Sequence, residues 1–406
     1  MADSINRLLV VDGDPDTAKI IVETAGNMGF AVASADTATH FLQLVDDFDP
    51  TVVFMDLHLP EIDGVQLLRL LGARDCEADI VLVSGSDRRV VSTAIDLGTS
   101  RGLTMAGMLA KPILAPDLQT KLTGVLRQDR KLGAAELRQA LGSGQLSAYY
   151  QPKASLVSGG GWKIDAVEAL VRWQHPELGL VMPDEFIPLA ERSGLIAELT
   201  EQVLAQALRQ MRAWNAIGLK LRCAVNLAPS LVTDLDLPDR VARLVAENGL
   251  DGAQLTLELT ETATMQDPTA AMDILTRLRV KNIGLSLDDF GTGFSSLTRL
   301  YQMPFGEMKI DKSLVMNVPR SREANTIVES LIELAHNLGL KVCAEGVESR
   351  AALDLLEILN CDCCQGYFIS RALPGTEIPS LVFNWNEQSP ASWTNKPKAR
   401  LPSAVV

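Results

Sequence analysis

Short apolar runs recur through the chain, and segments with helical periodicity separate most of them. Strands that alternate with helices build parallel sheets covered by helices, because each crossover between parallel strands needs room for a helix. In such sheets, functional side chains gather at the carboxyl ends of the strands. The residues that follow each run therefore constrain both the fold and the chemistry of this chain.

The first 125 residues contain four apolar runs that predict strands of a doubly wound parallel sheet, with helices on both faces. The runs are Leu8–Val11, Val52–Met55, Ile80–Val83 and Met108–Ala110. Polar residues follow them, namely Asp12, Asp14, Asp56, Ser84 and Lys111. Three carboxylates, a hydroxyl and a lysine at one sheet edge could hold a hard cation and present Asp56 as a nucleophile toward phosphorus.

This stretch resembles the receiver domain of bacterial response regulators over about residues 6 to 126. The matching segments are Leu-Val-Val-Asp12, Met-Asp56-Leu-His-Leu-Pro60-Glu-Ile-Asp-Gly64, Ser84 and Lys111-Pro112. The resemblance implies a flavodoxin-like domain in which Asp56 is the phosphoacceptor and Ser84 and Lys111 are its switch partners. It also implies that Asp12 helps to hold Mg²⁺, and that a sensor histidine kinase or phosphotransfer protein is a partner.

The chain departs from the receiver pattern next to Asp12. Where the family usually has a second acidic residue, this chain has Gly13. Asp14, one position further on, is the candidate substitute in the Mg²⁺ site.

Eight further runs lie between Leu146 and Ser370, and helical segments separate most of them. The runs are Leu146–Tyr150, Ile164–Leu170, Cys223–Leu227, Leu255–Leu259, Ile283–Leu287, Glu307–Ile310, Val342–Ala344 and Gln365–Ile369. About 240 residues with eight strand–helix repeats is the size of a (β/α)₈ TIM-type barrel.

Polar groups suited to metal binding lie at the ends of six consecutive runs. They are Glu168, Asn226, Glu258, Glu261, Asp288, Asp289, Lys309, Asp311, Glu345 and Glu348. So many carboxylates facing one bowl cannot all stay ionised without cations, and oxygen ligands favour Mg²⁺ or Mn²⁺ over Zn²⁺. Two such ions could activate a water and stabilise both oxygens of a phosphodiester displacement. Lys309 adds a positive charge for the phosphate or the attacking water.

The same residues carry a resemblance to the EAL family of cyclic di-GMP phosphodiesterases, over about residues 134 to 380. Its motifs are Glu168-Ala-Leu170-Val-Arg172-Trp173, Tyr-Tyr-Gln151-Pro, Val-Asn226-Leu, Glu258-Leu-Thr-Glu261-Thr, Asp288-Asp289-Phe-Gly-Thr-Gly, Lys309-Ile-Asp311, Ala-Glu345-Gly-Val-Glu348 and Gln365-Gly-Tyr. The resemblance implies hydrolysis of cyclic di-GMP to linear pGpG, tuned by the receiver domain.

The resemblance also implies a role for each motif residue. The first metal would be held by Glu168, Asn226, Glu258 and Asp288, and the second by Asp288 and Asp289. Glu345 would be the general base or a second-metal ligand, and Lys309 would position the water. Substrate contacts would come from Gln151, Leu170 and Arg172, with Gln365 nearby. Glu261 and Glu348 would anchor the loop from Asp289 to Ser296, which the family uses to couple dimerisation with metal binding, so a homo-oligomer is expected.

The domain boundaries follow from changes in periodicity and composition. We expect a receiver domain at 1–126, a helical linker at 127–144, an EAL barrel at 145–386 and a tail at 387–406. The tail is rich in Ser, Pro, Asn and Lys without periodicity, which is typical of disorder.

Charge and cysteine content exclude several classes of protein. A net charge of −14 argues against nucleic-acid or anionic-membrane partners, and no apolar run reaches the roughly 18 residues of a membrane span. Six scattered cysteines form no disulfide framework, so we expect a cytoplasmic protein. Cys361, Cys363 and Cys364 lack a second ligand pair at zinc-finger spacing, which favours buried thiols over a zinc site.

Two other functions stay open at this stage. One is a catalytically silent receptor that binds cyclic di-GMP and acts through a protein partner. The other, from the residues alone, is a magnesium-dependent barrel enzyme that stabilises an enolate with Lys309 as base.

Overall fold

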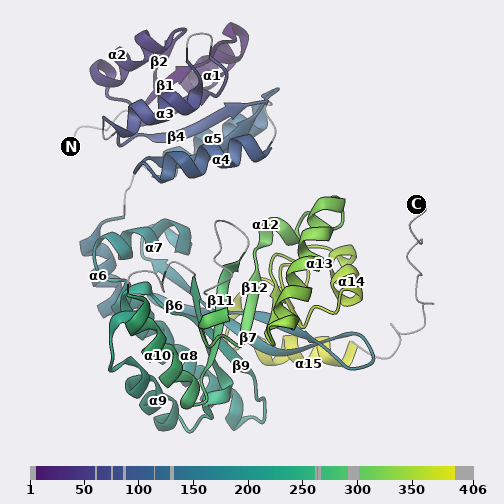
Figure 1. The fold of residues 1–406 in the computed structure, drawn as a ribbon. Coiled ribbons are helices and arrows are strands. Elements are labelled where there is room, and N and C mark those ends of the chain that lie inside the picture. Colours follow the sequence, from purple (N-terminus) through teal and green to yellow (C-terminus); the bar gives the residue numbers. More distant parts are fainter. Residues whose placement is uncertain are drawn as a thin grey trace, which may run out of the picture. The chain divides into compact units, whose positions relative to one another are not determined.

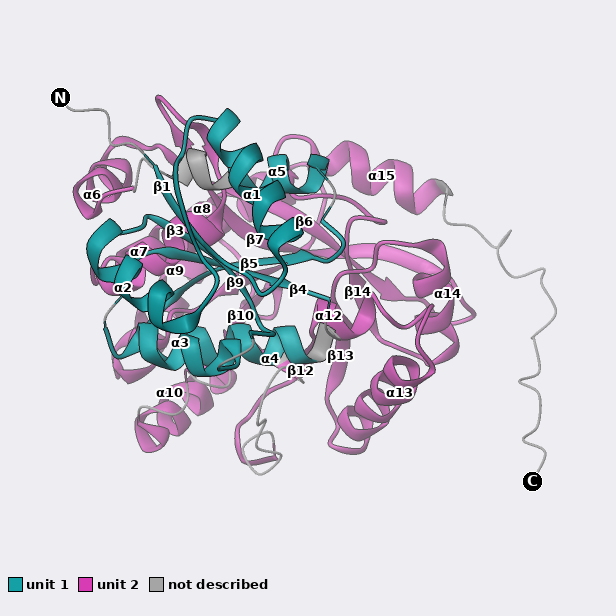
Figure 2. Ribbon diagram, turned by 90° about the horizontal axis from the view of Figure 1, so that it is seen from above, with its two compact units in different colours: residues 1–131 teal, residues 132–406 magenta. Residues whose placement is uncertain are grey.

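The computed structural model describes residues 6–59, 62–74, 76–85, 88–113, 115–128, 132–260, 263, 267–290 and 301–388. The chain forms two compact units, residues 1–131 and 132–406, which Figure 2 shows in different colours. No helix among these described residues is long and apolar enough to cross a membrane.

The first unit is a five-stranded parallel sheet with helices on both faces (Figure 1). The strands, in sheet order, are β2 (Ala31–Ala35), β1 (Arg7–Val11), β3 (Val52–Asp56), β4 (Asp79–Ser84) and β5 (Thr104–Ala110). The helices are α1 (Pro15–Asn27), α2 (Ala38–Phe48), α3 (Gly64–Gly72), α4 (Arg88–Thr99) and α5 (Ala115–Gln128). The predicted doubly wound sheet is confirmed, with β2 added at an edge.

Side chains that point alternately to the two faces of the sheet give it two hydrophobic cores. Leu9 packs in one cluster with Phe41 of α2, whereas its neighbour Leu8 packs in the other with Ile21 of α1. Successive side chains of a strand point to opposite faces, so an uninterrupted apolar run is what a sheet covered on both sides requires.

The second unit is a closed eight-stranded barrel, as predicted. Around the ring the strands are β6 (Leu146–Leu156), β7 (Trp162–His175), β9 (Arg222–Asn226), β10 (Leu255–Thr260), β11 (Gly284–Phe290), β12 (Glu307–Ile310), β13 (Lys341–Ala344) and β14 (Cys363–Gln365), and β14 pairs with β6 to close it. Short strands β8 (Gly179–Val181) and β15 (Leu373–Pro374) pair with β7 and β6.

Helices cover the outside of the barrel (Figure 1). They are α6 (Ala134–Ser143), α7 (Pro183–Arg192), α8 (Ile196–Ala216), α9 (Leu237–Glu247), α10 (Pro268–Val280), α12 (Lys312–Val315), α13 (Arg322–Asn337), α14 (Arg350–Ile358) and α15 (Ile378–Gln388), with short 3₁₀ turns at Pro229–Thr233 and Gly252–Gln254. Helix α6 lies within the segment predicted as a linker, and its Leu137 and Ala140 belong to the barrel's hydrophobic core. The predicted tail falls almost entirely on residues 389–406, which lie outside the described residues.

The first strand of the barrel departs from a regular strand–helix repeat. Strand β6 runs antiparallel to both of its barrel neighbours, β7 and β14. A tight turn joins β6 to β7 in place of a helix, and Val157 N–H donates to the Gly161 carbonyl across it at 2.9 Å. Gly159, Gly160 and Gly161 all have φ between 87° and 100°, a region that favours glycine.

The eighth predicted run is displaced along the chain. Strand β14 ends at Gln365, whereas the prediction continued to Ile369. Gly366 lies against the backbone of Val347, where a Cβ would come within 2.2 Å of the Val347 nitrogen. The chain therefore turns away from the sheet directly after Gln365.

Candidate active site

The carboxyl ends of the parallel barrel strands bring the predicted polar residues to one mouth. Register pairs Glu258 of β10 with Asn226 of β9, and Thr260, two residues further along β10, with Asp288 of β11. Because β6 is antiparallel, its residue Gln151 pairs with Glu168 of β7 at the same mouth. Residues far apart in sequence thus meet through strand register.

Lys309 lies at the centre of this mouth. Its Nζ is 2.7 Å from Glu345 Oε1, 2.8 Å from Glu258 Oε2, 3.1 Å from Asp288 Oδ1 and 3.7 Å from Glu168 Oε2. Only 1% of the lysine is exposed, so these carboxylates replace the water that it would otherwise bind. Five residues that the sequence analysis singled out are therefore in one ion-paired cluster.

Burial and neighbouring charges give the carboxylates of this cluster different pKa values. Burial raises the pKa of Glu168 to about 8, and the neighbouring charge of Glu258 adds to the effect. Burial also opposes ionisation of Glu258, but Lys309 and Lys153 outweigh it and lower its pKa to about 2. Burial raises the pKa of Glu345 as well. The cluster thus has more negative charge than its lysines balance.

Amide groups hold Glu168 in place. Gln365 Nε2 donates to Glu168 Oε2 at 2.7 Å and to Gln151 Oε1 at 3.0 Å, and Asn226 Nδ2 donates to Glu168 Oε1 at 2.9 Å. Gln151 in turn donates to the Ser370 carbonyl at 3.2 Å. Gln365 Oε1 is buried without a hydrogen-bond partner among the described residues. Both glutamines therefore position Glu168 from the side of β6 and β14.

The rim of the mouth carries aromatic and cationic side chains. Leu170 and Arg172 follow Glu168 along β7 at intervals of two, which places all three on one face of the strand. The Arg172 guanidinium lies 5.9 Å from the Tyr149 ring centroid. Burial lowers the pKa of Arg172, which nonetheless stays charged at neutral pH.

Four of the polar residues predicted at the strand ends are not part of the observed cluster. Asp311 caps α12 instead, where its carboxylate accepts from Ser313 N–H at 2.8 Å. Glu348 is exposed in the loop after β13. Glu261 and the side chain of Asp289 lie outside the described residues, as does most of the loop that they were predicted to anchor or begin. Their roles stay predictions.

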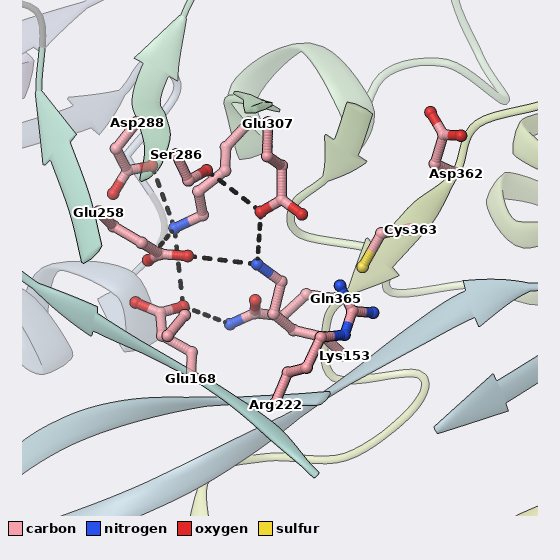
Figure 3. Close-up of polar contacts among 12 residues, drawn as sticks. Lys153, Glu168, Arg222, Glu258, Ser286, Asp288, Glu307, Asp362, Cys363 and Gln365 are labelled. Atoms are coloured by element: carbon pink, nitrogen blue, oxygen red, sulfur yellow. Dashed lines mark hydrogen bonds and ion pairs between the residues drawn. The ribbon is translucent and has the colours of Figure 1, made fainter. Parts of the chain in front are cut away.

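Three interior residues were missed by the sequence analysis. Lys153 Nζ is 3.2 Å from Glu258 Oε1 and 2.9 Å from Glu307 Oε1, and Ser286 Oγ donates to the same Glu307 oxygen at 3.1 Å (Figure 3). The signal was the position of Lys153, two residues after Gln151 and hence on the same face of a strand. The predicted run ended at Tyr150, so Lys153 was not assigned to a strand.

The donor set of the mouth fits a hard divalent cation. Lys153 and Lys309 face five acidic groups, three more than the two lysines can neutralise, in Glu168, Glu258, Asp288, Glu307 and Glu345. Oxygen donors with surplus negative charge are what Mg²⁺ and Mn²⁺ require. Among the described residues, no three or more His, Cys, Asp or Glu side chains lie together in a metal-binding geometry, and the carboxylates of the mouth contact Lys309 instead.

The first unit has its own acidic site at the carboxyl end of its sheet. Lys111 Nζ bridges Asp12 Oδ1 at 2.8 Å and Asp56 Oδ2 at 2.7 Å. Burial raises the pKa of Asp12, whose Oδ2 is buried without a hydrogen-bond partner among the described residues. Ser84 is buried at the end of β4. The residues predicted around the phosphoacceptor thus lie at one sheet edge.

Asp14 is engaged elsewhere. It is the N-cap of α1, and its carboxylate accepts from Asp16 N–H at 3.1 Å and from the Thr17 hydroxyl at 2.7 Å. Asp14 contacts Asp12 through its backbone N–H, which donates to Asp12 Oδ1 at 2.9 Å alongside Lys111 Nζ. The carboxylate of Asp14 therefore stabilises the start of a helix.

Family comparisons match both units. A model of the EAL domain matches residues 134–372, and a model of the response regulator receiver domain matches residues 8–123. The cyclic di-GMP phosphodiesterase RocR of Pseudomonas aeruginosa is 32% identical over 333 residues, which cover 80% of this chain and 84% of RocR.

Further relatives are more identical over a shorter part of the chain. The bifunctional diguanylate cyclase/cyclic di-GMP phosphodiesterase MucR of Pseudomonas aeruginosa is 39% identical over 61% of this chain and 36% of its own length. The chain thus spans about a third of the length of the first curated relatives it matches. A solved structure of the PaMucR phosphodiesterase as a c-di-GMP complex has a TM-score of 0.56 and 39% identity, and covers 60% of this chain and 98% of that one.

Proposed function

The chain belongs to the EAL-domain family and carries an N-terminal response regulator receiver domain, and we propose that its barrel hydrolyses cyclic di-GMP to linear pGpG under control of the receiver. The observation that carries this proposal is the buried Lys309 with four carboxylates from different strands around it. The names of RocR and MucR support the substrate.

EAL phosphodiesterases generally depend on divalent metals, and we propose Mg²⁺ or Mn²⁺ here, with two ions in the barrel. The first ion would be held by Glu168, Asn226, Glu258 and Asp288, and the second by Asp288 and Asp289. When bound, the ions would supply Lewis acidity for the attacking water and the phosphate oxygens.

The chain's own groups would divide the remaining work. Glu345 would take the proton of the attacking water, and Lys309, 2.7 Å away, holds that carboxylate in place. Gln365 and Gln151 keep Glu168 turned into the mouth. At the rim, the Arg172 guanidinium is suited to a phosphate oxygen and Leu170 to apolar contact with a base.

We also propose that the receiver is phosphorylated on Asp56 by a sensor histidine kinase or phosphotransfer protein, with Asp12 contributing to a Mg²⁺ site. Lys111 now pairs with Asp56, so a phosphoryl group there would exchange this ion pair for one with a phosphate oxygen. Ser84, at the end of the next strand, would bind a second phosphoryl oxygen. The active form is proposed to be a homo-oligomer.

Binding and turnover of cyclic di-GMP, measured side by side, test this function. The purified chain in Mn²⁺ is expected to form pGpG, followed by chromatography, whereas Glu168→Gln loses turnover because it lacks one of the proposed metal ligands. Glu247→Gln, the same substitution at an exposed position of α9, is the matched control and stays active. Tight binding of cyclic di-GMP by the wild type without any pGpG would instead identify a silent receptor.

A further inference from the structure

Lys153 is a buried lysine inside the barrel that the proposed mechanism does not use. It is 3% exposed and lies on β6, one pleat deeper than Gln151. Figure 3 shows its ammonium group between the carboxylates of Glu258 and Glu307. A lysine in this position must gain enough from its partners to offset the loss of its hydration.

Glu258 is shared between two lysines. Its Oε1 lies 3.2 Å from Lys153 and its Oε2 lies 2.8 Å from Lys309, while the carboxylate itself is fully buried. Each carboxylate oxygen has a further lone pair, so Glu258 can bind a metal ion while keeping both contacts. Lys153 therefore acts on the same carboxylate that is proposed to hold the first ion.

Glu307, the second partner of Lys153, lies toward the amino-terminal end of the parallel barrel strands. Glu307 begins β12 and lines a cavity of about 960 Å³, together with Arg222 and Cys363. Arg222 pairs with Asp165 at 2.9 Å, whereas Lys153 forms an ion pair with Glu307 at 2.9 Å. Lys153 thus balances two carboxylates that lie on either side of it.

We propose that Lys153 is an internal counter-ion of the active site: its charge, shared between Glu258 and Glu307, stabilises the cation-free barrel and limits the affinity of the mouth for divalent ions. This inference rests on the proposed metal-dependent hydrolysis. Carboxylates crowded into one site need positive charge whether or not a divalent ion is present. A fixed ammonium supplies part of it, and the same ammonium repels an incoming ion.

The charge count makes opposite predictions for the two partners. Lys153→Met raises the excess of negative charge, so it should destabilise the cation-free protein and tighten Mn²⁺ binding by at least about tenfold. Glu307→Gln keeps the shape and the hydrogen-bonding capacity of the side chain but lowers the excess, so it should weaken Mn²⁺ binding by about threefold or more. The double variant restores the wild-type charge balance and should bind Mn²⁺ within about threefold of the wild type.

The experiment is Mn²⁺ calorimetry and thermal unfolding with and without Mn²⁺, on the full chain. Every protein carries Asp12→Asn, which removes the acidic group proposed to hold an ion in the receiver. Lys220→Met is the matched control, because Lys220 is an exposed lysine just before strand β9 and does not line the cavity beside Glu307. Its affinity should equal that of the parent.

The expected result for Lys153→Met is a melting temperature lower by about 5 °C or more without Mn²⁺, largely recovered when Mn²⁺ is added. A merely structural role would lower the melting temperature equally in both conditions and leave the affinity unchanged, which would overturn the inference. If Lys153→Met does not fold, the Mn²⁺ affinity of Glu307→Gln tests the inference. An affinity of this variant equal to or tighter than that of the parent would overturn the inference.

Hydrolysis by the wild-type chain without Asp12→Asn, assayed alongside the variants, separates this inference from the proposed function. A wild type that binds Mn²⁺ but leaves cyclic di-GMP intact refutes the function, while the variant affinities still decide the role of Lys153. A wild type that hydrolyses cyclic di-GMP, with all affinities equal, refutes only the counter-ion. A wild type that binds no Mn²⁺ refutes both.

Discussion

Single residues in the barrel gain their properties from burial and from the number of charges near them. Glu168 and Glu258 have the same side chain on the two strands that flank β9, yet the pKa of Glu168 is raised to about 8 and that of Glu258 is lowered to about 2. Both are buried, and the difference arises because Glu258 contacts two lysines at hydrogen-bond distance. Placement relative to Lys309 and Lys153 therefore decides the charge of each carboxylate.

Gln365→Leu should lower kcat by about tenfold with little change in KM. The substitution removes the amide that donates to Glu168 at 2.7 Å, and a hydrogen bond to a charged group contributes roughly 1.5–3 kcal/mol. Steady-state kinetics with cyclic di-GMP in saturating Mn²⁺ measure the split. A variant with wild-type kcat would show that Glu168 needs no help from Gln365.

Gly13→Asp should lower the Mg²⁺ concentration needed for half-maximal phosphorylation of Asp56 by about tenfold. It adds a carboxylate beside Asp12, whose Oδ2 is buried without a partner among the described residues. Gly13 does not have a positive φ, so its backbone conformation does not require glycine. Incorporation from acetyl phosphate at a series of Mg²⁺ concentrations measures the effect.

Asp14→Ala distinguishes the helix-capping role of Asp14 from the Mg²⁺-binding role proposed for Asp12. Because Asp14 caps α1, we expect a loss of about 1 kcal/mol in stability and an unchanged Mg²⁺ requirement. Loss of phosphorylation in folded Asp14→Ala would contradict this assignment.

The strand ends were predictable at the residue scale, and the barrel interior was not. A polar residue after an apolar run is visible in the sequence, and strand register brings Glu258 and Asn226 together as that pattern implies. For Lys153 the sequence indicates only a shared strand face with Gln151, because its partners Glu258 and Glu307 come from strands far along the chain. Only closure of the barrel places them within reach.

At the scale of elements, β6 is the strand that differs from the predicted repeat. Its antiparallel direction brings Gln151 to the mouth and Lys153 into the interior. The signal lay in Ser158-Gly-Gly-Gly161, because consecutive glycines between two strands favour a tight turn over a crossover helix. The direction of a strand is set by the length and conformation of its connection, which apolar runs do not encode.

Gly159→Ala should lower the free energy of unfolding by about 1–2 kcal/mol. Nothing lies within 4 Å of a Cβ at Gly159, so the cost comes from its φ of 100° alone. Gly142→Ala is the matched control: it also has open space, but it lies in α6, where alanine is favoured. Urea unfolding should give opposite signs for the two variants, and equal effects would contradict the argument.

At the scale of the whole molecule, two series of strands with different lengths and different polar ends define two units. That organisation could be predicted because each unit buries its own apolar runs, in two clusters around the open sheet and one in the barrel. The placement of α6 could not, because its amphipathic sequence fits either a linker or a helix packed on the barrel.

Asp56→Ala should abolish the response of phosphodiesterase activity to acetyl phosphate while leaving Mn²⁺ binding by the barrel unchanged. Asp56 belongs to the first unit, and the Glu258–Lys309 cluster to the second. Activity assays with and without the phosphodonor, together with Mn²⁺ calorimetry, measure both quantities. Equal activity of wild type and variant under every phosphorylation condition would remove the receiver from the mechanism.

The most direct test of the central claim is formation of pGpG by the full chain when the divalent ion is removed and returned. The charge excess around Lys309 predicts product in Mn²⁺, at least a hundredfold loss (roughly 3 kcal/mol) after chelation, and recovery when Mn²⁺ is restored. Glu258→Gln should form no product under any of the three conditions. Undiminished hydrolysis after chelation, or intact cyclic di-GMP in Mn²⁺, would contradict the claim.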